Sequence, residues 1–534
     1  MGTTSGRLPK MRHEDGIRKQ QTVSFGGLNH TLGARDGEIW AVKNMTSDHY
    51  PVLASRQSRY HLTTLDKPNG LYAHDGLFWV DGIDFFWDGE KVCTLSDSEK
   101  TFASLGAYVV ILPDRIAYNR LTHEVKPIEA AWSGSVTIQD GTYAEEEAKA
   151  NTIYGEGVDW ASLFQVGDAV TISGCTAHTE NNYTPIIREI DGEYLRFYEN
   201  TFVINEGGDT EAGVTIQRTM PDMDFLIENE NRLWGCKGDT IYASKLGDPF
   251  NWNVFDGLAT DSYAVNVGST GDFTAAFSYL GYPCFFKEEY IYKVYGYKPS
   301  NFQVMSSASL GVETGSHHSL AIAGEILFYL SRAGVVAYSG GIPQTISGPL
   351  GTQRYRNGVA GSDGRKYYIS MQDQEDNWHL FVYDTEQKLW VQEDNTHALR
   401  FAWNGGLYLQ EADPAGKVWL CGNPRDIPAG ATVEGPVESM VEFADFVEYS
   451  PSKKGTSKLQ VRVELDENST LDVDIQFDSD GVWHRVKTLT ATVKRSFVLP
   501  IIPRRSDHFR IRLSGRGDWK LWSLVRESYI GSDY

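Results

Sequence analysis

One pair of adjacent histidines is the first place in the sequence where two side chains could share a chemical task. His317 and His318 stand together in TGSHHSLAI, and they are the only adjacent pair among 13 histidines. Two imidazoles that bind one metal ion must point the same way, whereas neighbouring residues of a strand point to opposite faces. We therefore expect His317 and His318 to be loop or core residues and not metal ligands.

Two acidic strings could hold a hard cation. Asp222 and Asp224 in PDMDF would share one face of an extended segment, where two carboxylates could bind an ion such as Ca²⁺. The string DVDIQFDSDG, from Asp472 to Gly481, is as acidic as a calcium loop but lacks its D-x-D-x-D-G spacing and its closing Glu. A turn explains DSDG better, because Asp and Gly tolerate left-handed backbone angles. We expect no metal site.

The usual signatures of catalysis are missing. The sequence has no GxxxxGK[ST] phosphate loop, no GxGxxG, no HExxH and no GxSxG. The cysteines are dispersed without a CxxC pair, which is neither a zinc nor a disulfide pattern. They are Cys93, Cys175, Cys236, Cys284 and Cys421. We predict that all five are structural, that the protein assembles in a reducing cytoplasm, and that it is not an enzyme: it has no catalytic residue and no cofactor.

Charge gives the strongest chemical signal. The chain carries 49 Lys and Arg against 71 Asp and Glu, a net charge of −22, which argues against a protein that coats nucleic acid. Residues 451–534 nevertheless have 15 basic and 11 acidic residues, a net of +4, which leaves −26 for residues 1–450. Such a step in charge indicates a domain boundary and a surface that could meet an acidic partner.

The basic residues gather in one part of the C-terminal segment. Between His484 and Arg526 there are 11 basic and two acidic residues. In HFRIRLSG the apolar and basic residues alternate, so that the arginines would share the face opposite the core. We predict a face that contacts an acidic partner, the alternative being an ordinary solvated sheet face. Its candidate residues are Arg504, Arg505, Arg510, Arg512 and Arg516.

The elements around these residues read as β-hairpins in series. Seven segments share one plan, in which two short aromatic-aliphatic runs flank a turn that contains Gly or Asp. They begin at Gly70, Leu105, Asn231, Tyr279, Ala323, Gly361 and Phe401. From Asn231 onward the starts are 48, 44, 38 and 40 residues apart, which suits one four-stranded propeller blade. We predict an all-β fold with a divergent β-propeller, the alternative being large sandwiches of stacked hairpins.

Two further β domains complete the predicted architecture. Residues 131–219 interrupt the series and predict an inserted small β domain, in which TYAEEEAKANT is the one string that reads as a short helix. Strings such as KLQVRVEL alternate polar and apolar residues and predict a C-terminal β-sandwich. The predicted divisions are 1–60 (N-terminal arm and first strands), 61–130 and 220–436 (propeller blades), 131–219 (insert) and 437–534 (sandwich).

Several strings resemble bacteriophage virion proteins. A "gGlN" opening is followed by an acidic residue with Asn-Met and then by a "yPvLsxR" string. The matching residues are Gly26, Gly27, Leu28, Asn29, Glu38, Asn44, Met45, Tyr50, Pro51, Leu53 and Arg56. Further matches are NRLWGCKGDTIYASKLGDPFNW, with Ser244 to Trp252, and the strings GVETGS and GGIPQTIS. Together these strings, which cover most of 20–425, resemble the tail nozzle proteins of phages, also called hub, tail tubular or stabilisation proteins.

The resemblance implies a structural role. It implies a propeller-based subunit that forms a ring with other copies, typically a hexamer, in the virion tail after assembly in the host cytoplasm. The expected partners are portal and adaptor proteins, tail fibre or needle proteins, and the genomic DNA, which would pass through the channel without specific binding. A net negative body fits such a conduit, since each neutralised phosphate strengthens binding and adds friction.

Two other functions stay open. A propeller can gather carboxylates from several blades around its channel, so a glycan-binding or glycan-degrading tail protein is the main alternative. A kelch-like cytoplasmic scaffold is the other. The N-terminus shows no apolar signal-peptide core, and no run approaches 18 apolar residues, so we expect neither a cleaved leader nor a membrane span.

Overall fold

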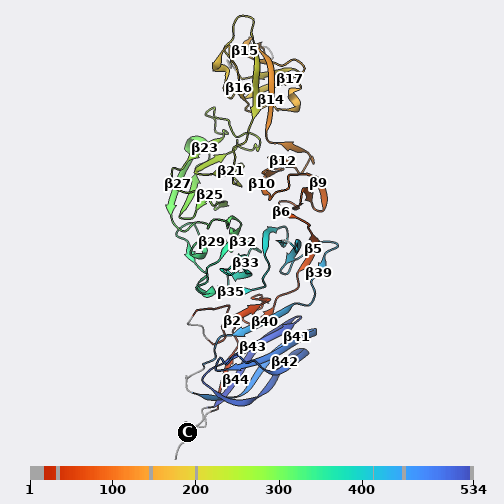
Figure 1. Cartoon of the computed structure of the whole chain (residues 1–534), viewed down its shortest axis with the longest axis vertical. Helices are drawn as coiled ribbons and strands as arrows, with labels where there is room; N and C mark the ends of the chain where they lie inside the picture. The colour runs from red at the N-terminus through yellow and green to blue at the C-terminus, as the bar shows by residue number, and fades with distance from the viewer. Residues whose placement is uncertain are drawn as a thin grey trace, which may run out of the picture.

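A computed structural model describes residues 17–31, 36–142, 148–198, 202–412, 414–447 and 453–529. Figure 1 shows three bodies in a row: an inserted sheet at the top, a ring of sheets in the middle and a C-terminal sheet at the bottom. The fold is all-β, as predicted. The helical elements of the described residues are five 3₁₀ segments of three residues each: η1 (Trp160–Ser162), η2 (Thr179–Asn181), η3 (Pro299–Asn301), η4 (His317–Ser319) and η5 (Gly348–Leu350).

The ring consists of seven antiparallel sheets among the described residues, which we call blades 1 to 7 in chain order. Blades 1 to 3 are β6 (Pro68–Ala73), β7 (Leu77–Asp81), β8 (Asp84–Trp87) and β9 (Glu90–Thr94); β10 (Thr101–Leu105), β11 (Tyr108–Leu112), β12 (Ile116–Asn119) and β13 (Val125–Pro127); and β20 (Phe225–Asn229), β21 (Arg232–Lys237), β22 (Thr240–Ala243) and β23 (Tyr263–Asn266). Blades 4 and 5 are β24 (Ala275–Tyr279), β25 (Tyr282–Lys287), β26 (Tyr290–Tyr295) and β27 (Gln303–Ala308); and β28 (Ala321–Ala323), β29 (Ile326–Ser331), β30 (Gly334–Tyr338) and β31 (Gln344–Thr345).

Blades 6 and 7 close the ring. Blade 6 has β32 (Arg356–Ser362), β33 (Lys366–Gln372), β34 (Trp378–Asp384) and β35 (Leu389–Gln392), and blade 7 has β36 (Ala398–Trp403), β37 (Leu407–Glu411), β38 (Lys417–Cys421), β5 (Tyr60–Thr64) and β39 (Thr432–Val433). Strand β5 comes from the N-terminal side of blade 1 and pairs with β38. Neighbouring blades share apolar cores around the whole ring. The pairing of β5 with β38 therefore closes the propeller.

Each of the seven hairpin segments expected from the sequence falls in one blade, which confirms the predicted propeller. The turns use residues that accept left-handed backbone angles. Gly82 between β7 and β8 and Gly238 between β21 and β22 both have φ of 58°. The aromatic runs form the layers between blades: the Phe78 ring of blade 1 lies edge-on to the Tyr118 ring of blade 2, with centroids 6.4 Å apart.

The insert leaves the ring after β13 and returns to it at β20. Its strands are β14 (Ala130–Gly141), β15 (Lys149–Tyr154), β16 (Thr171–Ser173), β17 (Ile187–Asp191), β18 (Tyr194–Phe197) and β19 (Asp209–Arg218). The edge strands β16 and β17 meet through a bridge between Ala169 and Ile186, so the sheet is a nearly closed barrel around Trp160 and other buried apolar residues. We call it the barrel.

The short helix expected within TYAEEEAKANT is wrong for its second half. Lys149 to Thr152 belong to β15, which pairs with both β14 and β18. Sheet pairing on both sides outweighs the helix propensity of Ala, Glu and Lys there. Glu145, Glu146 and Glu147 lie outside the described residues.

The C-terminal sheet draws strands from both ends of the chain. From the N-terminal side come β1 (Arg18–Thr22), β2 (Ile39–Lys43), β3 (Met45–Thr46) and β4 (Leu53–Ser55), and from the C-terminal side β40 (Glu438–Phe443), β41 (Lys454–Phe477), β42 (His484–Ser506), β43 (Phe509–Arg516) and β44 (Trp519–Tyr529). The first half of β41 pairs with β44 and the second half with β43, and the register shifts between Leu465 and Thr470. Both halves contribute to one core, which continues onto blades 5 and 6.

This arrangement differs from the sequence expectation in one respect. The sequence assigns residues 1–60 to an N-terminal arm and first strands, apart from the C-terminal domain, whereas the structure places four strands of this region in the C-terminal sheet. A strand of three residues such as β4 shows no alternation, so its pairing with β44, more than 400 positions away, leaves no local signal.

Candidate functional site

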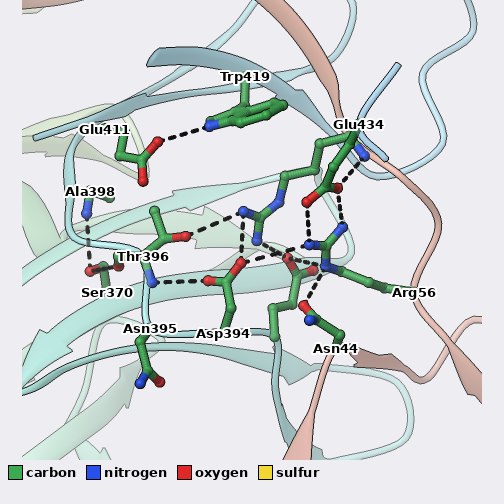
Figure 2. A network of polar contacts seen from close by, with 12 residues as sticks. Asn44, Arg56, Ser370, Asp394, Asn395, Thr396, Ala398, Glu411, Trp419 and Glu434 are labelled. Atoms are coloured by element: carbon green, nitrogen blue, oxygen red, sulfur yellow. Dashed lines mark hydrogen bonds and ion pairs between the residues drawn. The ribbon is translucent and has the colours of Figure 1, made fainter. Parts of the chain in front are cut away.

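Two buried arginines lie where the C-terminal sheet meets the propeller. Arg56 and Arg59 follow β4, and their side chains are 6% and 4% exposed. Arg56 donates to both carboxylate oxygens of Glu434, at 2.7 and 3.0 Å, and its Nε donates to Asn44 Oδ1 at 2.8 Å. Figure 2 shows Arg56 between Asn44 and Glu434. A bidentate pair of this kind fixes both distance and orientation.

Arg59 ties the same region to blade 6. It donates to Glu393 at 2.6 Å and lies 2.9 Å from Asp394, and both carboxylates directly follow β35. Burial opposes ionisation of Asp394, but Arg59, hydrogen bonds from Thr396 and the charge of Arg56 together outweigh it and lower the pKa of that carboxyl. We call Asn44, Arg56, Arg59, Glu393, Asp394 and Glu434 the C-terminal joint. Its charges compensate one another inside the protein.

The Gly-Gly-Leu-Asn string packs against the same blade. The Leu28 amide donates to the Trp390 carbonyl at 2.7 Å, and Leu28 is buried in the common core. A Cβ on Gly27 would stand 2.6 Å from that carbonyl oxygen, so the backbone approach requires glycine. Asn29 in turn donates to Glu38 at 2.9 Å. All three strings that open the resemblance therefore lie at or beside the C-terminal joint.

A second buried cluster attaches the barrel to blade 3. Asp168 is fully buried and pairs with Arg218 at the end of β19. Asn251 donates to Asp168 at 3.0 Å and to Asp248 at 2.7 Å, and its Oδ1 accepts from the Ala169 amide at 2.8 Å. We call Asp168, Arg218, Asp248 and Asn251 the barrel joint. Asp248 and Asn251 belong to the GDPFNW part of the resemblance, so these strings mark both joints of the molecule.

The two adjacent histidines lie in a connecting segment, as expected, but their rings do not point apart as those of neighbours in a strand would. His317 and His318 lie in the 3₁₀ segment η4 and not in a strand, and their ring centroids are 3.8 Å apart. His318 Nε2 lies 3.7 Å from a Glu99 oxygen, and Arg400 pairs with the same carboxylate. Glu99 precedes β10, His318 precedes β28 and Arg400 lies in β36, so three blades converge here. We call these four residues the inner cluster.

The inner cluster keeps its imidazoles neutral. Burial, with Arg400 nearby, lowers the pKa of His317 to about 4 and that of His318 to about 3. His318 and Arg400 lower the pKa of Glu99. One carboxylate and two neutral imidazoles within 4.8 Å of one another could hold a metal ion. Arg400 already pairs with the carboxylate, however, and its positive charge opposes a cation; the absence of a metal site stays a prediction.

A cleft of about 1300 Å³ lies beside the barrel joint. Tyr183 and Tyr198 of the barrel and Phe255 and Leu258 of the β22–β23 loop line it and are all partly exposed. Asn253 and other polar side chains complete the lining. Aromatic faces with a few polar groups suit a ligand with an apolar surface and hydroxyl or amide groups. No pattern in the sequence indicates this cleft, because its lining comes from separate segments.

The arginines predicted to contact a partner do not form one cationic face. Arg510 pairs with Glu442 at 3.2 Å and with Asp445, and these carboxylates help to raise its pKa against the effect of burial. Arg512 lies 3.4 Å from Asp474 and over the Trp483 ring. The outer face of β43 is thus a lattice of ion pairs, and Arg510 and Arg512 hold their own sheet together.

The other three predicted arginines are exposed. Arg504 lies 3.1 Å from Asp480 and over the Phe477 ring, and Arg505 donates to the Lys453 carbonyl at 3.3 Å. Arg516 is the last residue of β43. Contact with a partner stays a prediction for these residues.

The two acidic strings are engaged in ion pairs. Asp222 and Asp224 both lie near Lys237, and Asp222 also lies 3.4 Å from Arg115. Asp472 and Asp474 pair with Arg485 of β42. Asp478 lies in a left-handed turn, as DSDG suggests, close to Asp507 and His508; this is a second group of oxygen and nitrogen atoms that could hold a metal ion.

Comparison with known proteins leaves the family of the chain open. No protein-family model matches the chain, and no curated protein is similar to it. Among solved structures, Raptor of Chaetomium thermophilum is 12% identical over 70% of this chain, with a TM-score of 0.31, and this chain spans 29% of it. An exo-β-1,3-galactanase of Phanerochaete chrysosporium is 9% identical over 56% of this chain and 94% of its own, and a glycoside hydrolase is 8% identical over 90% and 97%, with TM-scores of 0.20 and 0.18. Likenesses this low carry no argument about function.

Proposed function

We propose that the protein is a structural subunit of a phage tail nozzle, which forms a ring that closes the tail channel and gives passage to the genome. The main support for the proposal is the position in the structure of the strings that resemble phage tail nozzle proteins. They contribute Asn44 and Arg56 to the C-terminal joint, and Asp248 and Asn251 to the barrel joint, the two buried clusters that attach the C-terminal sheet and the barrel to the propeller. They therefore serve the shape of the whole subunit.

A fixed shape is what a ring subunit needs. Contacts between copies in a ring are heterologous, so each subunit presents two different patches, and the ring closes only if the rotation between them is the same every time. A flexible hinge between the propeller and the C-terminal sheet would let the rotation between the two patches vary from one subunit to the next. The buried, charge-paired C-terminal joint and the shared core of apolar residues, such as Trp390 and Phe443, oppose such a hinge.

The charge distribution also fits a conduit for DNA. The barrel, residues 130–218, has 15 acidic and four basic residues, a net of −11, and it lies at the end of the molecule opposite the C-terminal sheet (Figure 1). An acidic surface repels the phosphate backbone and so lowers the friction on a passing duplex. Genomic DNA would then move past the subunit without specific binding.

The remaining parts of the proposal concern partners and place. The ring would be a hexamer that joins portal and adaptor proteins on one side and tail fibre or needle proteins on the other, in a virion tail assembled in the host cytoplasm. All five cysteines are free, and four are buried, as expected for a chain that folds under reducing conditions. Among the described residues, no helix is long and apolar enough to cross a membrane.

Light scattering of the purified chain, with its concentration varied, tests ring formation. The proposal predicts a closed assembly of one stoichiometry, with a mass that is an integral multiple of the monomer. A chain that stays monomeric, alone and with the portal–adaptor complex of its phage, would contradict it.

Glycan binding is the second candidate function, and the cleft beside the barrel joint is the observation that favours it. The inner cluster is less suited to glycan hydrolysis, which uses two carboxylates, because it contains the single carboxylate Glu99, paired with Arg400. Titration of the chain with capsule oligosaccharides, followed by the fluorescence of its tryptophans, tests the alternative. Saturable binding lost in Phe255→Ala would support it, and release of reducing sugar would make the protein an enzyme.

A further inference from the structure

Among the residues that the structure describes, strand β42 is an edge strand of the C-terminal sheet. It runs for 23 residues, from His484 to Ser506, and pairs with β41 on one side. Among the described residues no strand pairs with its other side. Ordinary strands have about five or six residues. A free edge of this length exposes a long row of backbone N–H and C=O groups that can template pairing with another chain.

The devices that usually protect an edge are weak over most of β42. Lysine side chains block a partner when they stand over the edge. Here Lys494 lies 3.0 Å from the Trp522 ring centroid, and Lys487 and Arg495 lie 5.8 and 5.4 Å from that of Phe497. Their charges are thus drawn onto aromatic rings of the sheet. Proline interrupts an edge because it has no N–H, and in β42 the prolines stand only at 500 and 503. Residues 484–499 are free of it.

Apolar side chains are exposed along the same stretch. Val493 is 85% exposed and Val498 is 51% exposed. Val482, just before the strand, is exposed as well. Burial of such side chains stabilises a strand that is added to the edge, while the backbone hydrogen bonds set its register.

We propose that a second copy of this chain covers the open edge of β42 by adding a strand to it. The inference rests on the proposed ring and names the surface through which the copies meet. The charge of β42 shows whether the strand can pair with a second β42 or needs a different strand. Residues 484–506 contain six basic residues and no acidic one. Two β42 strands side by side would face each other with like charges, which disfavours a two-fold pairing.

The occupant is therefore a different strand of the neighbouring copy, with an acidic or uncharged sequence. Residues 1–450 of that copy carry a net charge of −26, and they include end strands such as β27, Gln303–Ala308, which has no charged residue. A contact between two different surfaces is heterologous, and repeated heterologous contacts build rings or open filaments, not closed dimers. The same charge that makes β42 repel itself thus directs assembly toward a ring.

Substitutions on the edge test the inference in the full-length chain. In Val493→Glu/Val498→Glu the apolar side chains are lost and negative charge faces an acidic or neutral partner, so the dissociation constant of the assembly should rise at least tenfold. Val493→Lys/Val498→Lys removes the same apolar surface but keeps a complementary charge, so its effect should be smaller. Val23→Glu is the matched control, because Val23 is 52% exposed and lies outside β42. Sedimentation velocity, alone and with the portal–adaptor complex, measures each constant, and thermal unfolding should show unchanged midpoints.

Photocrosslinking from position 493 identifies the occupant. Benzoylphenylalanine in place of Val493 should form crosslinks to a second copy, at acidic or uncharged segments, and the same group at position 23 should not. Crosslinks within one copy, for example to residues 1–16, or assembly that survives both Glu substitutions, would overturn the inference and leave the proposed ring standing. Crosslinked open filaments would support the β42 contact and contradict the closed ring. A wild-type chain that stays monomeric under both conditions would overturn both.

Discussion

Arg59 shows at the scale of single residues how the molecule holds its shape. Its guanidinium is almost fully buried and is compensated by Glu393 and Asp394, which come from another part of the chain. Arg56 is one of the residues that match the strings of phage virion proteins, whereas Arg59 is not. No local pattern could have shown these contacts, because Arg59 and Glu393 are 334 residues apart and Arg56 and Glu434 are 378 residues apart.

Removal of one partner from the C-terminal joint should be costly. Arg59→Ala removes the nearer cation of the buried Glu393 and Asp394 and leaves them only Arg56, at 3.8 and 3.7 Å, so we expect it to lower the free energy of unfolding by about 3–5 kcal/mol. Urea denaturation followed by tryptophan fluorescence measures the change. Arg356→Ala is the control: Arg356 and its partner Asp376 are both exposed, and its loss should cost less than about 1 kcal/mol. Equal effects of the two substitutions would mean that the joint does not stabilise the fold.

The inner cluster predicts a particular pH dependence. The pKa of His317 is lowered to about 4 and that of His318 to about 3, whereas both are near 6.5 in the unfolded chain. The unfolded chain therefore takes up protons first as the pH falls. The stability that the neutral pair contributes is present in full above about pH 6.5 and declines as the pH falls toward 4.

Replacement of the pair should flatten this slope. We expect the midpoint of thermal unfolding of His317→Gln/His318→Gln to fall less between pH 7 and pH 5 than that of the wild type. His484→Gln, at an exposed histidine of β42, should keep the wild-type slope. A double variant with an unchanged slope would show that the histidines are not held neutral in the folded protein.

Strand β5 is the element on which closure of the propeller depends. The hairpins of the blades could be predicted because each has its own aromatic run and turn, but the partner of β5 could not. His61 pairs with Trp419 of β38 and with Thr432 of β39, both distant in sequence. Sequence patterns report the face that a strand buries, and not the strand with which it pairs.

A proline in β5 should therefore destabilise the ring. His61→Pro removes a backbone donor between two partner strands and leaves an acceptor unpaired, at a cost of about 1–3 kcal/mol before any packing loss. Gln344→Pro, in the exposed outer strand β31, is the control and should cost less. Differential scanning calorimetry measures both. A similar loss in the two variants would argue that β5 does not close the propeller.

The C-terminal sheet separates two groups of arginines that look alike in the sequence. Arg510→Glu/Arg512→Glu puts negative charge beside Glu442, Asp445 and Asp474, so we expect the folded monomer itself to lose stability. Arg504→Glu/Arg505→Glu changes two exposed residues and should leave the monomer folded while it weakens assembly. Thermal unfolding and sedimentation velocity distinguish the two effects. If Arg510→Glu/Arg512→Glu weakened assembly and left the monomer stable, Arg510 and Arg512 would be the residues that contact the partner.

At the scale of the whole molecule, the three bodies lie in a row with unlike ends (Figure 1). The sequence predicted the propeller, the insert and a C-terminal β domain, because composition and periodicity change at their boundaries. It could not predict the joints, the inner cluster or the cleft, since each brings together residues from distant segments; Glu99 and Arg400, for instance, are 301 residues apart. The net charge of −22 concealed the contrast between an acidic barrel and a basic C-terminal sheet.

The nozzle proposal depends most directly on how the subunit sits in an assembly. Electron microscopy of the purified chain mixed with the portal–adaptor complex of its phage gives the direct test. The account predicts a closed ring below the adaptor, with one copy per position and the propeller and C-terminal sheet in the same relative orientation in every copy. Portal–adaptor particles without added density, beside free monomers of the chain, would contradict it.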